Sequence, residues 1–203
     1  NGIKITVFDA GRAHNTHNEF TENGISSRIV NKEDDSYARH NHATQVTSVI
    51  AANGLNAGDI NATTPRSYSK GVLPQVSIDN YLYSATNLGN QYEKLANLSN
   101  LNISNHSYGI NNGWSKSGNA YYWGGDYTLN ELDTYSGVYG IQDENFDKIV
   151  YNNPNHIIIK STGNYYGLGP SANDLKYRWN PTTSSYVPFE ANDIIPASNC
   201  SNG

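Results

Sequence analysis

Residues 39–54, RHNHATQVTSVIAANG, contain the clearest helical pattern in this chain. Apolar side chains recur there at helical spacing, at Ala43, Val46, Val49, Ile50, Ala51 and Ala52. Asn53 and Gly54 then end the predicted helix. His42 therefore lies in its first turn, on a rigid backbone. Two interpretations of this side chain stay open at this point: it faces a cleft, or it caps the helix or packs under a loop.

Strands and helices alternate along the rest of the chain. Strand-like segments lie at Ile3–Phe8, Ile25–Val30, Val76–Tyr83, Leu101–Asn105 and His156–Ser161. Two more helices are predicted, one over Gln91–Leu98 and one that ends with Phe146–Tyr151. This alternation indicates crossover connections and a buried parallel sheet. We therefore expect an α/β fold.

The composition narrows the class of protein. With 203 residues, the chain is long enough to bury a real core. Its net charge is −5, whereas a nucleic-acid groove needs clustered Lys and Arg. No apolar run approaches the roughly 18 residues of a membrane helix, so we expect neither a nucleic-acid partner nor a membrane span. The 16 Tyr and 18 Gly residues are typical of a loop-rich protein that is secreted or lies at the cell surface. The absence of Met fits a chain cut from a longer one.

Polar residues follow several of the predicted strands. They are Asp9, the run Ser107-Tyr108-Gly109, and Asn164. In a parallel sheet, the carboxyl ends of the strands face the functional crevice. A carboxylate that orients an imidazole, together with an amide donor, can activate a nucleophile and stabilise an oxyanion. Taken singly, an Asp or a Gly-Asn pair after a strand is also typical of a turn.

Five segments, in this order, resemble those of the subtilisin-like serine proteases (subtilases). They are ITVFDAG (5–11), HATQVTSVIAA (42–52), KGVLPQVSI (70–78), NISNHSYG (102–109) and IIIKSTGN (157–164). Together they cover nearly all of the chain. The Tyr-, Asn- and Trp-rich insert at Ile110–Asp126 suggests an elaborated, secreted bacterial branch of the family.

The resemblance implies a fold, an activity and a set of site residues. The fold would be the three-layer subtilisin-like one, with a central, mostly parallel sheet and helices on both faces, incomplete at the C-terminal end. The activity would be that of a serine endopeptidase with an Asp-His-Ser triad, which needs no cofactor for its chemistry. Asp9 and His42 match the catalytic aspartate and histidine, and Asn164 matches the oxyanion-hole asparagine. The family's substrate-pairing segment matches Ser107, Tyr108 and Gly109, which would bind a polypeptide by strand addition.

The sequence departs from the family pattern in two places. In the histidine segment, Ala43 replaces a glycine and Gln45 replaces a second histidine, and neither change removes the imidazole. The nucleophile's Gly-Thr-Ser-Met-Ala segment is not found, and Thr183-Ser184-Ser185 is the nearest imitation. We therefore expect residues 1–203 to be the N-terminal portion of a single catalytic domain. Its partner would be a C-terminal segment of the same protease that carries the serine, and residues 1–203 alone would be inactive.

Two other functional classes stay open. The first is a subtilase-like binding domain without catalysis. The second is a metal site, because the spacings in His14-x-x-His17 and His40-x-His42 could suit two ligands of one metal ion. Zinc, however, needs three or four converging ligands. A structural calcium ion is the more natural metal, since the long loop offers oxygen ligands at Asn56, Asp59 and Asn61. The sequence assigns no complete ligand set.

Two further features carry expectations of their own. Cys200 is the single cysteine, and we expect it to pair with a cysteine beyond Gly203. A cluster of aromatic side chains lies in and after the substrate-pairing segment. These side chains either line a pocket or form the packing of the insert; they are Tyr108, Trp114, Tyr121, Tyr122 and Trp123.

Overall fold

The computed structural model describes most of the chain, in residues 4–22, 25–55, 70–98, 102–109, 113–125, 138–164, 167, 169–191 and 193–196. These residues form two compact units. The first unit comprises Asn1–Tyr108 and Asp143–Lys160, and the second comprises Gly109–Gln142 and Ser161–Gly203.

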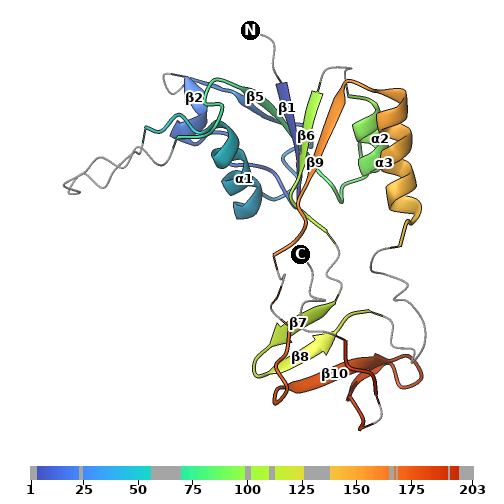
Figure 1. The fold of residues 1–203 in the computed structure, drawn as a ribbon. Coiled ribbons are helices and arrows are strands. Elements are labelled where there is room, and N and C mark those ends of the chain that lie inside the picture. The colour runs from blue at the N-terminus through green and yellow to red at the C-terminus, as the bar shows by residue number, and fades with distance from the viewer. Residues whose placement is uncertain are drawn as a thin grey trace, which may run out of the picture. The chain divides into compact units, whose positions relative to one another are not determined.

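A five-stranded parallel sheet forms the centre of the first unit (Figure 1). In spatial order its strands are β4 (Ile29–Asn31), β5 (Ser77–Leu82), β1 (Lys4–Asp9), β6 (Asn102–His106) and β9 (His156–Lys160). The four pairings between neighbouring strands are parallel, which agrees with the crossover pattern in the sequence.

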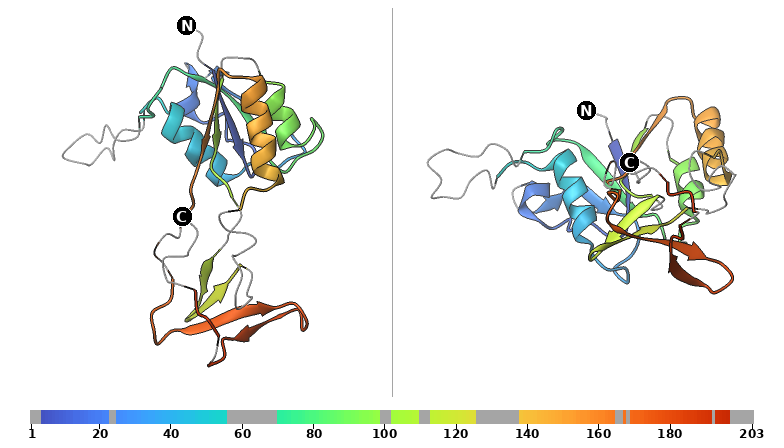
Figure 2. Two further views of the ribbon diagram at one scale, coloured as in Figure 1. Left: turned by 45° about the vertical axis from the view of Figure 1, so that its right-hand side comes forward. Right: turned by 60° about the horizontal axis from the view of Figure 1, so that its bottom comes forward.

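Helices cover both faces of this sheet (Figures 1 and 2). Helix α1 (Asn41–Ala51) lies on one face, and α2 (Gln91–Ala96) and α3 (Ile141–Asn152) lie on the other. Side chains of β1 alternate between the two cores, because successive residues of a strand point to opposite faces. Ile5 and Val7 pack in the core with α1, whereas Phe8 packs with Leu95 and Ile149 of α2 and α3. The expected three-layer α/β fold is confirmed.

A close approach of backbones fixes the C-terminal end of α1. The amides of Gly71, Val72 and Leu73 donate to the carbonyls of Ala52, Val49 and Ile50, respectively, at 2.8–3.0 Å. A Cβ on Gly71 would lie 2.6 Å from the amide nitrogens of Ala51 and Ala52, so only glycine fits here. This contact explains why a glycine opens the segment that leads into β5.

A buried ion pair ties α2 to the sheet. Lys94 Nζ lies 2.7 Å from Glu33 Oε1, and the two side chains are 1% and 0% exposed. The same ammonium donates to the carbonyls of Leu82 and Ala85, and Glu33 Oε2 accepts from the amide of Leu82. The buried charges are therefore paired and further hydrogen-bonded, as burial of ions requires.

The strand expected over Ile25–Val30 is broken in the structure. Ser26–Ser27 forms β3, which pairs antiparallel with β2 (Thr21–Glu22) after the short 3-10 helix η1 (Asn18–Phe20). The break falls at Arg28, whose buried guanidinium donates to the carbonyl oxygens of Glu19, Ala51 and Val76. The hydrogen bonds of Arg28 to these distant carbonyl oxygens therefore interrupt the local strand pattern.

The second unit contains a four-stranded sheet that the sequence pattern did not indicate. Its order is β11 (Ser185–Pro188), β10 (Leu175–Asn180), β8 (Ala120–Trp123) and β7 (Trp114–Ser117). The pair β8 and β10 is parallel, and the two outer pairs are antiparallel. Trp114, Tyr121 and Trp123 are buried in one cluster with Phe189 packed against it. For these three side chains, the interpretation as packing of the insert is confirmed.

None of the helices in the described part of the chain is long and apolar enough to cross a bilayer.

Candidate active site

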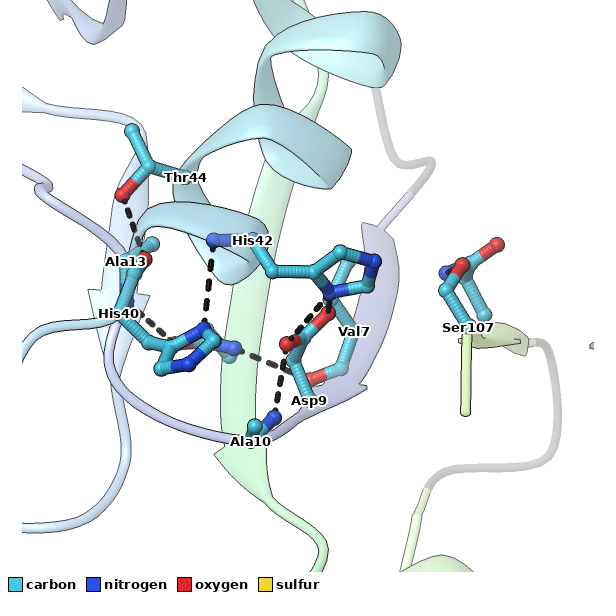
Figure 3. Close-up of polar contacts among 10 residues, drawn as sticks. Val7, Asp9, Ala10, Ala13, His40, His42, Thr44 and Ser107 are labelled. Carbon is cyan, nitrogen blue, oxygen red and sulfur yellow. Dashed lines mark hydrogen bonds and ion pairs between the residues drawn. The ribbon is translucent and has the colours of Figure 1, made fainter. Parts of the chain in front are cut away.

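Asp9 and His42 form a direct hydrogen bond, as the sequence predicts. Nδ1 of His42 lies 2.9 Å from both carboxylate oxygens of Asp9 (Figure 3). Asp9 ends β1 and has the same parity as Ile5 and Val7, so its side chain is on the face that α1 covers. The carboxylate is 1% exposed, whereas the imidazole is 47% exposed. The pair therefore joins a buried anion to an imidazole with an accessible edge.

The loop after β1 is held rigidly, so that Asp9 stays in place. The amide of Ala10 donates to Asp9 Oδ1 at 2.7 Å. Farther along, the amide of Ala13 donates to the side-chain oxygens of both Asn31 and Asn80, at 3.0 and 2.8 Å. These two asparagines come from β4 and β5, so the central sheet itself positions the loop.

His40, rather than His42, caps helix α1. Nδ1 of His40 accepts from the amide of His42 at 3.3 Å, and the backbone of His40 is extended, as at an N-cap. This contact resolves the two interpretations of the segment: His40 caps the start of the helix, and His42 presents its ring (Figure 3). His17 caps η1 in the same way, through an amide donation from Glu19 to its Nδ1.

The metal interpretation finds no support in the described residues. Among them, no three His, Cys, Asp or Glu side chains gather at one point. The rings of His14 and His17 are 6.1 Å apart between centroids and tilted by 62°, and His17 Nδ1 is already used as a cap. The calcium candidates Asn56, Asp59 and Asn61 lie outside the described residues.

Ser107 and Tyr108 directly follow β6, next to β1 in the sheet. In the close-up, the ring edge of His42 that does not contact Asp9 points in the direction of Ser107 (Figure 3). The Tyr108 ring stacks on Tyr83 with centroids 4.3 Å apart, and Lys160 Nζ lies 4.5 Å from its centroid. The same ammonium donates to the backbone carbonyl of Tyr108. Tyr108 is therefore packed on one side and held by a cation.

A buried polar chain that sequence reasoning missed continues from Tyr108 into the sheet. His106 Nδ1 lies 2.7 Å from the Tyr108 hydroxyl, and His106 Nε2 lies 2.9 Å from Ser104 Oγ. Nε2 of His156 lies 3.0 Å from the same serine oxygen. The sequence contained a signal for it, because Ser104 lies on the strand predicted over Leu101–Asn105 and His106 directly follows that strand. Buried polar groups of this kind need partners.

Burial shifts the pKa values along this chain. It lowers the pKa of His106 to about 3, with Lys160 and His156 adding to the effect through their charges. Burial likewise lowers the pKa of His156 and raises that of the Tyr108 hydroxyl. Each shift favours the neutral form, because a charge in a low-dielectric interior is unfavourable. At neutral pH the four hydrogen-bonded side chains are therefore uncharged.

Comparison with known protein families places the chain in a family. The model of the Subtilase family matches residues 1–200. The chain belongs to this family. No curated protein and no solved structure matched the chain. Subtilases are serine proteases, so the protein is of the hydrolase class. The Asp9–His42 pair lies at the carboxyl end of a central strand of its sheet.

The predicted oxyanion residue of this subtilase lies in the second unit. Asn164 is exposed and follows Gly163, whose φ of 110° is a conformation that L-residues rarely adopt. Its position relative to Asp9 and His42 stays a prediction, because the two residues belong to the first unit. Gly109, the last residue of the substrate-pairing segment, is also exposed, and a Cβ there would meet no atom within 4 Å.

Two other predictions concern serine and cysteine residues. Thr183-Ser184-Ser185, the nearest imitation of the subtilase nucleophile segment, falls at the turn between β10 and β11, where Ser184 has a φ of 49°. It therefore does not begin a helix. Cys200 lies outside the described residues, so its pairing stays a prediction.

Proposed function

We propose that the chain supplies the Asp, the His and the oxyanion Asn of a serine endopeptidase. The observation that carries this proposal is the hydrogen bond of 2.9 Å between the buried Asp9 carboxylate and Nδ1 of His42. A carboxylate at Nδ1 fixes the tautomer with the proton on that nitrogen and leaves Nε2 free to accept one. This arrangement is what a general base for a serine hydroxyl requires.

Each residue then has one role in peptide-bond hydrolysis. Nε2 of His42 takes the proton of a serine Oγ as that oxygen attacks the scissile carbonyl, and Asp9 stabilises the imidazolium that forms. The imidazolium passes the proton to the leaving amine, and water then hydrolyses the acyl-enzyme with His42 again as base. The side-chain amide of Asn164 donates to the oxyanion, and one such donor is worth about 2.7–4 kcal/mol of transition-state binding.

The substrate is a polypeptide in extended conformation. Ser107, Tyr108 and Gly109 follow a sheet strand and would pair their backbone groups with the substrate backbone. The open space around the α-carbon of Gly109 leaves room for a second backbone to approach. Because backbone pairing is largely independent of sequence, side-chain pockets would set the cleavage preference.

We place the nucleophilic serine on a segment of the same protease outside residues 1–203. Within this chain, the best local match, Thr183-Ser184-Ser185, lies at a hairpin turn rather than at a helix start. A subtilase of this composition fits secretion or the cell surface. A structural calcium ion would bind near Asn56, Asp59 and Asn61, whose side chains offer oxygen ligands.

The test is covalent labelling of the natively purified protein with a fluorophosphonate, followed by mass spectrometry of the labelled peptide. Labelling of a serine outside residues 1–203 would support the proposal. Labelling of a serine within them, Ser107 included, would overturn the assignment of the nucleophile, as would peptide cleavage by residues 1–203 alone. Absence of labelling in a complete, folded protein would instead favour a binding domain without catalysis.

Two histidines in the same turn provide a matched pair of variants. His42→Asn removes the base and should abolish labelling. His40→Asn replaces the helix cap by another good cap and should leave labelling unchanged, because an asparagine oxygen can accept from the amide of His42 as His40 Nδ1 does. Equal loss in both variants would indicate a folding defect rather than loss of a base.

A further inference from the structure

Tyr108 belongs to a series of hydrogen bonds that links α2 to one face of the sheet. Beyond His106, its hydroxyl also donates to Gln91 Oε1 at 2.8 Å. Gln91 begins α2, His106 ends β6 and His156 begins β9, so the chain connects three separate elements. The parallel register of β6 and β9, which pairs Asn102 with His156, brings these residues to one face of the sheet.

The donors and acceptors along this chain fix a single direction. Since the Tyr108 hydroxyl donates to Gln91, it must accept from His106, which therefore carries its proton on Nδ1. Nε2 of His106 then accepts from Ser104, and the serine oxygen accepts from Nε2–H of His156. This direction leaves His156 Nδ1, which has no partner among the described residues, as a bare lone pair. The opposite direction would bury an unpaired N–H there, which is the costlier defect.

Packing keeps the central imidazole in one orientation. His106 is 1% exposed. Its ring stacks on Phe8 with centroids 4.8 Å apart and planes within 10°, and meets Phe146 edge-on at 5.7 Å. Phe8 sets the plane of the ring, and Nε2 is bound to Ser104. The Nδ1–H group therefore points at the Tyr108 hydroxyl.

We propose that His106, oriented by Ser104 and His156, is a positioning residue that holds Tyr108, and with it the backbone of Ser107–Gly109, in one conformation. The inference deepens the proposed function and rests on it, since this segment is the one that would pair with the peptide substrate. Because His106 bonds to the hydroxyl of Tyr108, it acts on substrate binding through Tyr108 rather than on proton transfer.

The first test measures the segment itself. Asparagine bonds its amide nitrogen to Cγ, as histidine bonds Nδ1, so His106→Asn retains a donor toward Tyr108. Glutamine places its amide one bond farther, in the manner of Nε2, so His106→Gln loses that donor. Amide hydrogen exchange of Ser107–Gly109 should be about 2–10-fold faster in His106→Gln than in His106→Asn, the effect of one hydrogen bond. Equal exchange in both variants would overturn the proposal.

A second pair of variants creates no cavity, so it serves even if the His106 variants fail to fold. Tyr108→Phe removes the hydroxyl that His106 contacts, whereas Tyr92→Phe removes a neighbouring buried hydroxyl that is not bonded to His106. Nitrogen-15 NMR should show His106 protonated on Nδ1 in the parent and in Tyr92→Phe, with a changed His106 signal in Tyr108→Phe. A His106 signal that is insensitive to Tyr108→Phe would contradict the hydrogen bond between His106 and the Tyr108 hydroxyl.

Peptide kinetics then separate this proposal from the proposed function. In a preparation that contains the nucleophile, Tyr108→Phe and His106→Gln should raise KM by about 2–10-fold and leave kcat nearly unchanged. A loss confined to kcat would overturn the positioning role. If no complete preparation cleaves peptides, the proposed function fails, and the exchange and NMR measurements still decide whether His106 fixes Tyr108.

Discussion

Gly11 and His40 approach each other so closely that a Cβ on the glycine would lie 2.6 Å from the Cβ of His40. The same Cβ would lie 3.1 Å from the carbonyl oxygen of Ala38. Two backbone hydrogen bonds close this contact, from Arg12 to Ala38 and from His40 to Arg12. The glycine two residues after Asp9 therefore brings the end of β1 against the start of α1, where the hydrogen bond to His42 forms.

Gly11→Ala should destabilise the first unit and loosen the Asp9–His42 contact. The added methyl group must displace backbone or the Cβ of His40, and overpacking of this kind typically costs about 1–3 kcal/mol. Urea unfolding measures the change in the free energy of unfolding. An unchanged midpoint, with His42 still bonded to Asp9 by nitrogen-15 NMR, would contradict the prediction.

Gly109→Ala should affect peptide binding and not stability. A Cβ there meets nothing within 4 Å, so the free energy of unfolding should stay within about 0.5 kcal/mol of the parent value. The methyl group would instead obstruct a peptide backbone that pairs with Ser107–Gly109, and we expect kcat/KM to fall by roughly tenfold, about 1.4 kcal/mol. Unfolding curves and peptide kinetics on the same preparation check both parts, and unchanged kinetics would remove Gly109 from the substrate-pairing segment.

Asp9→Asn should leave the fold intact and reduce peptide hydrolysis by roughly 10⁴-fold. An asparagine that donates to Nδ1 would favour the tautomer with the proton on Nε2, and His42 could then no longer act as a base. Nitrogen-15 NMR of the histidine rings reads the tautomer directly, and kcat measures its effect. Full activity in this variant would rule out a triad role for Asp9.

Lys94→Met should destabilise the protein strongly, because it leaves the Glu33 carboxylate buried without its counter-charge. Breaking a buried pair in this way typically costs about 3–5 kcal/mol. Adding Glu33→Gln in the same chain removes the stranded charge and keeps an acceptor for the amide of Leu82. The double variant should therefore be more stable than Lys94→Met alone in urea unfolding; if it is less stable, the charge is not the cause.

Acid should destabilise the protein through His106. The unfolded histidine gains a proton near its ordinary pKa of 6.5, whereas burial lowers the folded pKa to about 3. The folded state thus binds fewer protons between these values, so stability is fully present above about pH 6.5 and is lost as the pH falls toward 3. Relative to His106→Asn, the parent should lose about 2 kcal/mol between about pH 7.5 and pH 5. Burial lowers the pKa of His156 too, and both proteins share that contribution. A difference that does not vary with pH would contradict the lowered pKa.

The first unit was largely predictable from the sequence. Strands and helices follow from periodicities of about two and 3.6 residues, which a short window of sequence contains. The helix expected to hold His42 in its first turn is α1, and the strands expected before Asp9 and Ser107 are β1 and β6. Their pairing in a parallel sheet also followed, because alternating elements allow few connections.

The second unit was not predictable in the same way. Its strands β8 and β10 pair in parallel across more than fifty residues, and β7 and β8 are four residues each. Short strands in an aromatic-rich segment carry little periodic signal, so the aromatic residues of the insert could be assigned to packing only once Trp114, Tyr121 and Trp123 were seen in one cluster.

The sequence by itself determined where Asp9 and His42 lie in the elements, since each stands at an element boundary that local pattern marks. Only the tertiary structure decided that His40 caps α1 while His42 presents its ring. The two histidines lie in the same short segment, and they differ in their hydrogen-bond partners: the amide of His42 for His40, and the Asp9 carboxylate for His42. It also decided why Gly11 and Gly71 must be glycine, and it joined Ser104 to His156, 52 positions away. The physical reason is common to all three: close approaches and buried hydrogen bonds depend on which distant segments meet, and no local window of sequence contains both partners.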